Sequence, residues 1–380
     1  MQNFEFRNPT EILFGRGMIA QLESRVPAGA PVLLLYGGGS IKRNGVYDQV
    51  KAALKNRQVV EFGGIEANPL YETCLEAVKA VRFNQVGFIL AVGGGSVLDA
   101  AKFIAVATRH EGADPWEILR THGQSIQAAL PLGAVLTLPA TGSESNGNAV
   151  ISRRATTEKL AFASILAFPV FSVLDPETTY SLPRKQVRNG IVDAFMHVME
   201  QYMTYPSAAP LQDRFAEAIL ETLIETGPVT LAEPENYDAR AAFMWSATMA
   251  LNTLIGSGVP QDWSTHMIGH ELTAFYGLDH AETLAIVLPG VWKHQFDRKK
   301  AKLEQYGQRV WKVRAAKEAM ARTEDFLHAL GMPTRLGDYT IDAREAAEKV
   351  RTRFAERETK LGEHGDIGPD AAAEILRSRA

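Results

Sequence analysis

Residues 87–107 read GFILAVGGGSVLDAAKFIAVA and join a short apolar run to a glycine-rich turn and an apolar stretch. We predict a buried strand, a turn at Gly93–Ser96 and a helix over residues 96–107. Such a turn lets the backbone approach a ligand closely, and the amides at a helix start favour an anion such as a pyrophosphate. The stretch is not the G-x-G-x-x-G fingerprint. An ordinary turn in which Ser96 and Asp99 cap the helix therefore explains it equally well.

The same alternation continues on both sides of this stretch. The apolar runs that read as strands are Pro31–Tyr36, Val59–Phe62, Gly87–Val92 and Ala134–Leu138. Helical patterns lie between them, near residues 44–57 and 70–83. Strands that alternate with helices indicate a parallel sheet covered by helices on both faces, and the apolar runs fit strands buried on both sides.

From about Pro183 the pattern changes to long helical stretches. We expect helices near residues 186–203, 211–226, 236–256, 261–276, 282–297, 300–330 with a break, 342–358 and 370–379. The prolines that we interpret as helix breakers are Pro228, Pro234, Pro260 and Pro289. The sequence thus predicts an α/β domain with a Rossmann-like parallel sheet over residues 1–182, followed by an all-α domain over residues 183–380.

The composition is that of an ordinary globular protein, with 380 residues, 46% hydrophobic, 22% charged and a formal net charge of −4. This balance lacks the basic footprint of a duplex-binding protein, so we expect no nucleic-acid partner. No apolar run approaches the ~18 residues of a membrane span, and the first residues lack a signal-peptide core. We therefore expect a cytoplasmic protein with no membrane partner. The single cysteine, Cys74, excludes an intrachain disulfide and a cysteine-based metal cluster.

A second glycine-rich turn ends the first apolar run and consists of Gly37, Gly38, Gly39 and Ser40. In many nicotinamide proteins an acid in such a turn binds the adenosine ribose hydroxyl. This turn has no acid, and Lys42 and Arg43 follow it. Open amides, a hydroxyl and two cations suit a 2′-phosphate better, so NADP(H) is favoured if a dinucleotide binds. The alternative is a flexible turn whose basic neighbours are simply solvated.

Histidine and aspartate residues form a second group with chemical potential. Asp193 and His197 are four residues apart in a helical pattern, as are His266 and His270, and His280 follows a predicted helix break. A carboxylate among apolar neighbours is costly without a partner, and a metal ion would remove that cost. Imidazole and carboxylate suit zinc, iron(II), cobalt or nickel. Each histidine alone is better explained as a structural residue, and only the group as a whole predicts a metal site.

The role of His270 stays open at this point. It lies one helical turn beyond His266, so it could be a fifth ligand, a group beside the metal or a proton relay. A purely structural histidine is the remaining alternative.

These motifs resemble those of the iron-containing (group III) alcohol dehydrogenase family, and most closely its NADPH-dependent aldehyde reductase and butanol dehydrogenase-like branch. The resemblance covers essentially the whole chain. Its motifs are GGGSVLD at residues 93–99, TLPATGSE at 137–144, GIVDAFMHVME at 190–200, and the stretch from His266 through His270 to His280. Arg188 departs from the family pattern, which has a small or apolar residue just before the ligand helix.

The resemblance implies a dehydroquinate synthase-like architecture and assigns roles residue by residue. It implies that the metal ligands are Asp193, His197, His266 and His280, with His270 beside the metal as the catalytic residue. It implies a cofactor site made of Gly37, Gly38, Gly39, Ser40, Gly94, Gly95, Ser96, Asp99, Thr137, Leu138, Thr141 and Lys159. Taken alone, the loop that begins at Thr141 is better explained as a polar turn than as the lining of a cofactor groove.

The function implied is the reversible reduction of aldehydes to primary alcohols. Hydride passes from NADPH to a carbonyl polarised by one divalent ion, zinc or iron(II), in the cleft between a dinucleotide-binding first domain and a metal-binding second domain. The resemblance also implies a homodimer. Two alternatives stay open: a metal-dependent lyase or cyclase of the dehydroquinate synthase type, and a non-catalytic nucleotide- or metal-binding protein.

Overall fold

The computed structural model describes residues 1–380, which divide into two compact units. Unit 1 consists of Met1–Phe6, Arg184–Glu233 and Met249–Ala380. Unit 2 consists of Arg7–Pro183 and Pro234–Thr248. Each unit is therefore built from more than one stretch of the chain. The expected division into domains over residues 1–182 and 183–380 stays a prediction.

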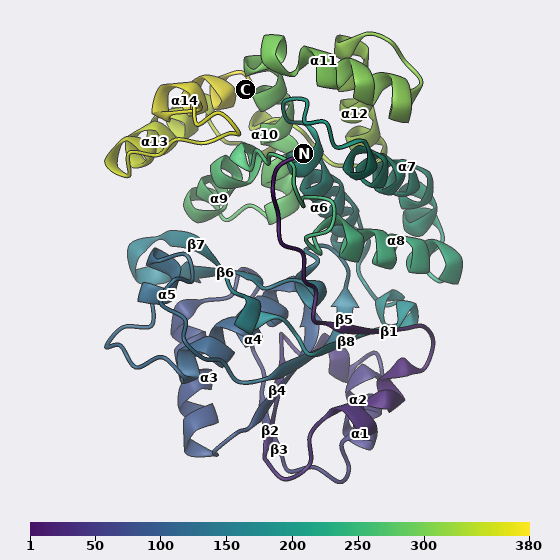
Figure 1. Ribbon diagram of the computed structural model, residues 1–380, viewed down its shortest axis with the longest axis vertical. Helices are drawn as coiled ribbons and strands as arrows, with labels where there is room; N and C mark the ends of the chain where they lie inside the picture. Colours follow the sequence, from purple (N-terminus) through teal and green to yellow (C-terminus); the bar gives the residue numbers. More distant parts are fainter. The chain divides into compact units, whose positions relative to one another are not determined.

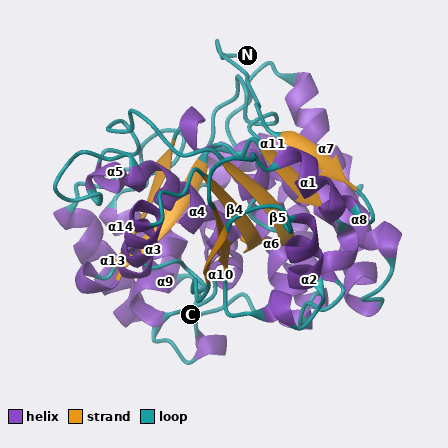
Figure 2. Ribbon diagram, turned by 90° about the horizontal axis from the view of Figure 1, so that it is seen from below, coloured by secondary structure: helices purple, strands orange, loops and turns teal.

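Unit 2 contains a six-stranded sheet in the order β1-β8-β5-β4-β2-β3, in which every neighbouring pair is parallel (Figure 1). Its strands are β1 (Glu11–Phe14), β2 (Val32–Tyr36), β3 (Val59–Phe62), β4 (Phe88–Gly94), β5 (Leu132–Leu138) and β8 (Phe171–Leu174). The view coloured by secondary structure shows helices of this unit on both sides of the strands, with α2 (Val46–Ala53) on one side and α3 (Tyr71–Phe83) on the other (Figure 2). The prediction of a parallel α/β sheet is confirmed.

Both faces of the sheet are buried. Because side chains alternate along each strand, one strand contributes residues to the cores on both faces. In β2, Leu33 and Leu35 join one apolar core together with residues of α3 (Tyr71–Phe83) and α4 (Gly95–Thr108). Val32 and Leu34 join a second core with residues of α1 (Leu22–Arg25) and α2 (Val46–Ala53). The continuous apolar run VLLLY is the sequence signature of this arrangement.

Several elements of unit 2 were not predicted. Besides β1 and β8, they are the short helix α5 (Glu117–Arg120) and an antiparallel pair, β6 (Asn148–Arg153) and β7 (Glu158–Ala163). The helix α8 (Tyr237–Ala250) is shorter than the predicted 236–256, and its residues up to Thr248 belong to unit 2. Unit 2 thus takes a segment from the part of the sequence that reads as helical.

The helical nature of unit 1 is confirmed. Its helices are α6 (Arg184–Tyr202), α7 (Pro210–Ala232), α9 (Ser264–Tyr276), α10 (His280–His294), α11 (Phe296–Tyr306), α12 (Ala316–Ala329), α13 (Ala343–Glu356) and α14 (Pro369–Arg377). The interpretation of Pro228 and Pro289 as breakers is wrong, since they lie inside α7 and α10. Both helices bury long apolar faces, and this packing outweighs the local cost of a proline, about 3 kcal/mol.

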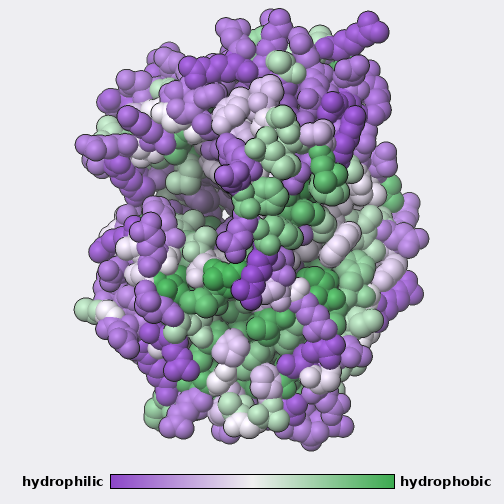
Figure 3. Space-filling view, in the orientation of Figure 1, coloured by the Kyte–Doolittle hydropathy of each residue, from purple (hydrophilic) through white to green (hydrophobic).

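The surface of unit 1 is mainly hydrophilic on the face drawn in the space-filling view, with hydrophobic residues in smaller groups (Figure 3). None of the helices combines the length and the apolar character needed to cross a membrane.

Candidate functional site

The turn between β4 and α4 is the first predicted cofactor element. Helix α4 begins at Gly95 with Gly94 as N-cap, and no side chain caps it. The prediction that Ser96 and Asp99 cap this helix is therefore wrong. The Asp99 carboxylate instead accepts hydrogen bonds from Ser143 Oγ at 2.7 Å and from the Val150 amide at 2.9 Å. The first amides of α4 are left without a side-chain cap, which suits an anionic ligand.

The loop after β5 packs directly against this turn. A Cβ atom on Gly95 would lie 2.5 Å from Thr141 Oγ1, and one on Gly94 would lie 2.9 Å from Leu138 Cβ. Only glycine therefore fits at these two positions without a shift of the loop. Thr137 is buried on β5 just before Leu138. The structure thus brings Gly94, Gly95, Thr137, Leu138 and Thr141 together.

Asn68 connects two further predicted residues and was missed by sequence reasoning. Its backbone amide donates to Ser96 Oγ at 3.3 Å, and its side-chain oxygen accepts from Lys159 Nζ at 2.9 Å. Asn68 has a φ of 56°, a conformation that asparagine tolerates better than most residues. The only sequence signal was the dipeptide Asn68-Pro69, which is typical of a turn.

A buried lysine holds the loop that begins at Thr141. Lys102 of α4 is fully buried, and its ammonium donates to Ser143 Oγ at 2.7 Å, Asn146 Oδ1 at 3.0 Å and the Asn148 carbonyl at 2.7 Å. Burial lowers the pKa of Lys102 to about 8, and the nearby Asp99 and Glu144 oppose this shift. This network shows that the loop is more than a solvated polar turn.

The turn Gly37–Ser40 follows β2, and Gly39 has a φ of 85° that favours glycine. Lys42 lies 4.8 Å and 4.9 Å from the ring centroids of Tyr36 and Tyr47. It also lies 3.8 Å from Glu61 on β3, an acid that the sequence reading did not connect with this turn.

Glu61 is already engaged by its neighbours. Its carboxylate accepts from Tyr47 Oη at 2.7 Å and from Lys51 Nζ at 3.2 Å. These contacts lower the pKa of Glu61, the hydrogen bond from Tyr47 most of all. Glu61 is therefore an ionised carboxylate whose oxygens already accept hydrogen bonds from Tyr47 and Lys51.

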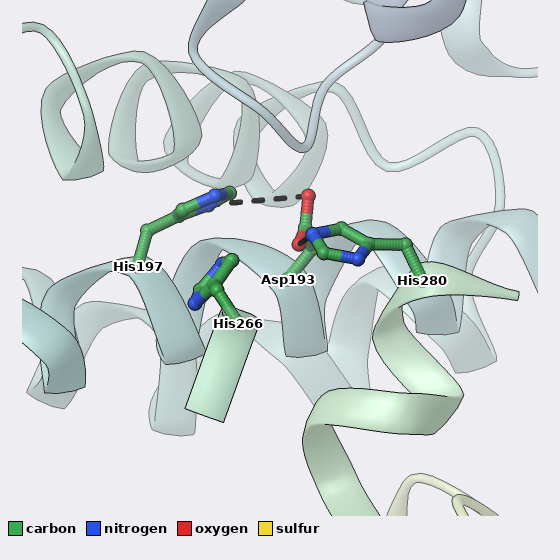
Figure 4. A group of neighbouring side chains, drawn as sticks. All are labelled: Asp193, His197, His266 and His280. Carbon is green, nitrogen blue, oxygen red and sulfur yellow. Dashed lines mark ion pairs between the residues drawn. The ribbon is translucent and has the colours of Figure 1, made fainter. Parts of the chain in front are cut away.

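Unit 1 brings the four predicted metal ligands together. Asp193 and His197 lie one turn apart on α6, His266 lies on α9 and His280 is the first residue of α10. One ligand atom of each residue lies within 4.8 Å of those of the other three. Figure 4 shows the four side chains pointing toward one another, with Asp193 between His197 and His280 in the ion pairs drawn. His197 Nδ1 lies 3.9 Å and His280 Nε2 lies 3.6 Å from Asp193 carboxylate oxygens.

His270 lies next to this cluster. It is buried, with 6% of its surface exposed, and its ring centroid is 5.3 Å from that of His280. Asp193, His197 and His266 are buried too, whereas His280 is partly exposed. His270 therefore lies beside the cluster without belonging to the group of four.

Charged contacts fix the start of α10, and with it His280. Asp279 and Glu282 form a capping box at the helix start. Arg188 of α6 reaches Glu282 at 3.1 Å, and Asn189 donates to Asp279 at 3.0 Å. Arg188, the residue that departs from the family pattern, thus ties α6 to the helix that carries His280.

Two further residues lie beside the cluster, and sequence reasoning gave the second of them, Glu200, no role. Trp263 has a φ of 62°, a strained conformation for an aromatic residue, and its ring centroid lies 5.0 Å from that of His266. Glu200 is 2% exposed and contacts the same histidine. Burial raises the pKa of Glu200, with Asp262 adding to the shift and the His266 amide and Lys299 opposing it. The glutamate in the motif GIVDAFMHVME was the available signal.

The donor set of the cluster fits a divalent transition metal. One carboxylate and three imidazoles, largely shielded from water, match the ligands and the number of ligands preferred by zinc and are acceptable to iron(II). Without a cation, a buried carboxylate in this place would lose its hydration beside neutral imidazoles. Chemically, this arrangement can hold a Lewis acid.

Comparison with known proteins gives consistent results for both units. Residues 9–176 match the family described as iron-containing alcohol dehydrogenase, and residues 188–378 match the C-terminal part of the same family. The NADPH-dependent aldehyde reductase YqhD of Escherichia coli K12 is 56% identical, with 100% of both chains covered. NADP-dependent alcohol dehydrogenase 3 of Entamoeba histolytica is 40% identical, with 99% of this chain and 98% of the relative covered.

Solved structures agree with these matches. The crystal structure of E. coli YqhD has a TM-score of 0.98 and covers 100% of this chain and 99% of the other, at 56% identity. That of NADH-dependent butanol dehydrogenase A from Thermotoga maritima has a TM-score of 0.95 at 35% identity, with 100% and 99% covered. The predicted resemblance is confirmed.

Proposed function

Because this chain belongs to the iron-containing alcohol dehydrogenase family, we propose that it reduces aldehydes to primary alcohols with NADPH and one divalent metal ion. One observation carries this proposal. The cluster of Asp193, His197, His266 and His280 is intact in a chain that is 56% identical, from end to end, to a protein named as an NADPH-dependent aldehyde reductase.

The metal would be held by these four side chains, as Fe(II) or as zinc. When bound, the metal ion supplies Lewis acidity toward the carbonyl oxygen and NADPH supplies the hydride. The task of Asp193 in this proposal is to balance the cation charge inside the buried cluster. The three imidazoles complete a set without thiolate, which suits either metal.

The cofactor would be held by residues of unit 2, whose free amides and hydroxyls suit phosphate groups. These residues are Gly37, Gly38, Gly39, Ser40, Gly94, Gly95, Ser96, Asp99, Thr137, Leu138, Thr141 and Lys159. Asp99 contributes through its hydrogen bonds to Ser143 and Val150, which hold the neighbouring loop. The absence of an acid from Gly37–Ser40 supports a preference for NADPH over NADH.

His270 is the residue that we propose to handle the proton. An imidazole nitrogen of His270 would hold the proton that the product alcohol requires and exchange it with water. Its burial beside His280 supports this role, because a group there is close to the proposed metal ligands without being one of the four.

The proposal is tested by measuring NADPH oxidation with a panel of short and medium-length aldehydes, on protein whose metal content has been determined. We expect metal-dependent turnover with NADPH and weaker turnover with NADH. Turnover with NADH alone would contradict the cofactor assignment. Binding of NADPH and metal without net oxidation by any aldehyde would favour a lyase or cyclase, or a binding protein, instead.

Assembly and location extend the same proposal. We propose a homodimer that works in the cytoplasm. The family resemblance supports the dimer. Light scattering on the purified protein would measure the mass, and a monomer would contradict the first part.

A further inference from the structure

Glu200 is a buried acid close to the four proposed metal ligands, and the proposed function assigns no role to it. It lies on α6, three residues beyond His197, and is only 2% exposed. Burying a carboxylate is expensive unless it is fully hydrogen-bonded. The partners of Glu200 therefore indicate what this residue is for.

The partners of Glu200 lie at the start of α9. Glu200 Oε1 accepts a hydrogen bond from the His266 backbone amide at 2.8 Å and lies 3.0 Å from His266 Nδ1. The Glu200 carbonyl accepts from the Asp262 amide at 2.9 Å. Main chain and side chain of one residue on α6 thus both hold the segment that leads into His266.

The carboxylate also satisfies an amide at the start of α9. The helix begins at Ser264, and its N-cap residue Trp263 is left-handed and provides no side-chain cap. Asp262 Oδ1 accepts from the Ser264 amide at 3.0 Å. His266 is the third residue of the helix, so its amide is one of those without a partner inside the helix. Glu200 satisfies this amide from another helix.

The same contact decides which nitrogen of His266 is available. Glu200 Oε1 already accepts from the His266 backbone amide, so it faces Nδ1 as an acceptor, and the 3.0 Å contact favours the tautomer with the proton on Nδ1. Nε2 then keeps its lone pair for a cation. A carboxylate behind a ligating imidazole also increases its basicity and fixes the orientation of its ring.

We propose that Glu200 is a positioning residue for His266. It fixes the backbone, the ring orientation and the tautomer of this ligand, and it couples α6, which carries Asp193 and His197, to α9. The inference rests on the proposed function in one respect, namely that the four clustered side chains hold a metal ion.

The test measures metal affinity directly. Metal-free protein is titrated with Co²⁺ and with Zn²⁺ in competition with a chromophoric chelator, for the wild type and for Glu200→Gln and Glu200→Ala. Gln keeps one acceptor oxygen but replaces the other with an amide donor, so we expect affinity to fall by roughly 10-fold. Ala removes both oxygens, and a fall of roughly 100-fold is expected. The visible absorption spectrum of bound Co²⁺ should change in both variants, because the ligand geometry at His266 changes.

A matched control separates this role from general stability. Glu217 lies on α7 of unit 1 and is about as buried as Glu200. Its carboxylate accepts hydrogen bonds from Tyr202 at 2.9 Å and from Arg309 at 2.9 Å. Glu217→Gln should lower the melting temperature and leave Co²⁺ affinity and spectrum unchanged.

Each outcome is decisive. Wild-type affinity and an unchanged Co²⁺ spectrum in Glu200→Gln and in any folded Glu200→Ala would overturn the inference, even if their melting temperatures fell. If Glu200→Ala does not fold, the Gln variant alone decides by the same two readouts. A wild-type protein that binds neither ion would overturn the proposed function, and this inference with it.

Discussion

At the residue scale, two histidines one helical turn apart, His266 and His270, have different surroundings. His266 belongs to the group whose ligand atoms lie within 4.8 Å of one another, and His270 lies beside that group. Both histidines are buried, so only their contacts distinguish them. The spacing of four residues predicted that both histidines lie on one face of a helix. It did not predict which of the two joins the group of four.

His270→Ala should therefore slow aldehyde reduction while metal content stays near that of the wild type. Removal of one general acid typically lowers the rate by roughly 10²- to 10⁴-fold. His280→Ala is the matched comparison, and it should lose both metal and activity. Metal analysis and turnover of the two variants check this, and loss of metal in His270→Ala would make His270 a ligand.

Ser40→Asp should shift the cofactor preference toward NADH. A carboxylate in the Gly37–Ser40 turn would repel a 2′-phosphate and could accept a hydrogen bond from a 2′-hydroxyl. We expect KM for NADPH to rise about tenfold or more, with KM for NADH unchanged or lower. Ser40→Ala controls for loss of the hydroxyl, and equal effects of both variants would argue against a charge-based preference.

The buried Lys102 predicts a pH dependence of stability. Its pKa is lowered to about 8 in the fold, whereas an exposed lysine has a pKa of about 10.4. Between these pH values the unfolded chain therefore binds more protons than the folded chain. The free energy of unfolding increases with rising pH in that window. The gain is about 3 kcal/mol in total. Chemical denaturation of the wild type and of Lys102→Met at about pH 7 to 10 measures this effect. The difference in the free energy of unfolding should change with rising pH in favour of the wild type. A constant difference would contradict the lowered pKa.

At the element scale, the tight packing of α9 against α10 depends on one small residue, Gly269. A Cβ atom on Gly269 would lie 2.7 Å from Thr283 Oγ1 and 3.2 Å from Leu284 Cδ2. Thr283 Oγ1 in turn donates to the His280 carbonyl at 2.7 Å. The spacing between the helix that carries His266 and the helix that carries His280 is thus set by a missing methyl group.

Gly269→Ala should push these helices apart. Overpacking of this kind costs about 1–3 kcal/mol of stability, and the metal affinity should fall with it because His280 moves relative to His266. Thr283→Ala removes the clashing hydroxyl, so the double variant should recover much of the affinity. Metal titration of the three variants measures this coupling, and strictly additive losses would contradict it.

The elements also show where sequence reasoning succeeds. The strand VLLLY and the turn after it were predictable because every residue of a doubly buried strand is apolar. The grouping of Asp193, His197, His266 and His280 was predictable because histidine and aspartate have few reasons to gather in apolar helices. Pro228 and Pro289 were misread because tertiary packing overrides a local helix penalty. The contacts of Asn68 and Glu200 depend on segments far apart in sequence, which no local pattern encodes.

At the scale of the whole molecule, the chain crosses between its two units more than once. Residues 234–248 return to unit 2 after the chain has entered unit 1. This segment places Met244 in the core beneath the sheet and stacks Trp245 edge-on to Phe14 at 5.9 Å. Thr248 Oγ1 donates to Glu144, whose pKa is raised by complete burial. Unit 2 therefore needs a segment that lies far beyond Pro183.

A fragment that ends at Pro183 should accordingly be unstable. Without residues 234–248 it exposes the core around Met244 and leaves the Glu144 carboxyl without its Thr248 partner, and an unpaired buried polar group costs about 1–3 kcal/mol. Fusing residues 234–248 to residues 1–183 through a long Gly/Ser linker should restore cooperative unfolding, since such a linker leaves the segment free to dock. The same fusion with Met244→Asp is the control, because a charge in the core should cancel the rescue. Thermal denaturation of the three proteins compares them directly, and a fragment 1–183 as stable as the fusion would show that the returning segment is dispensable.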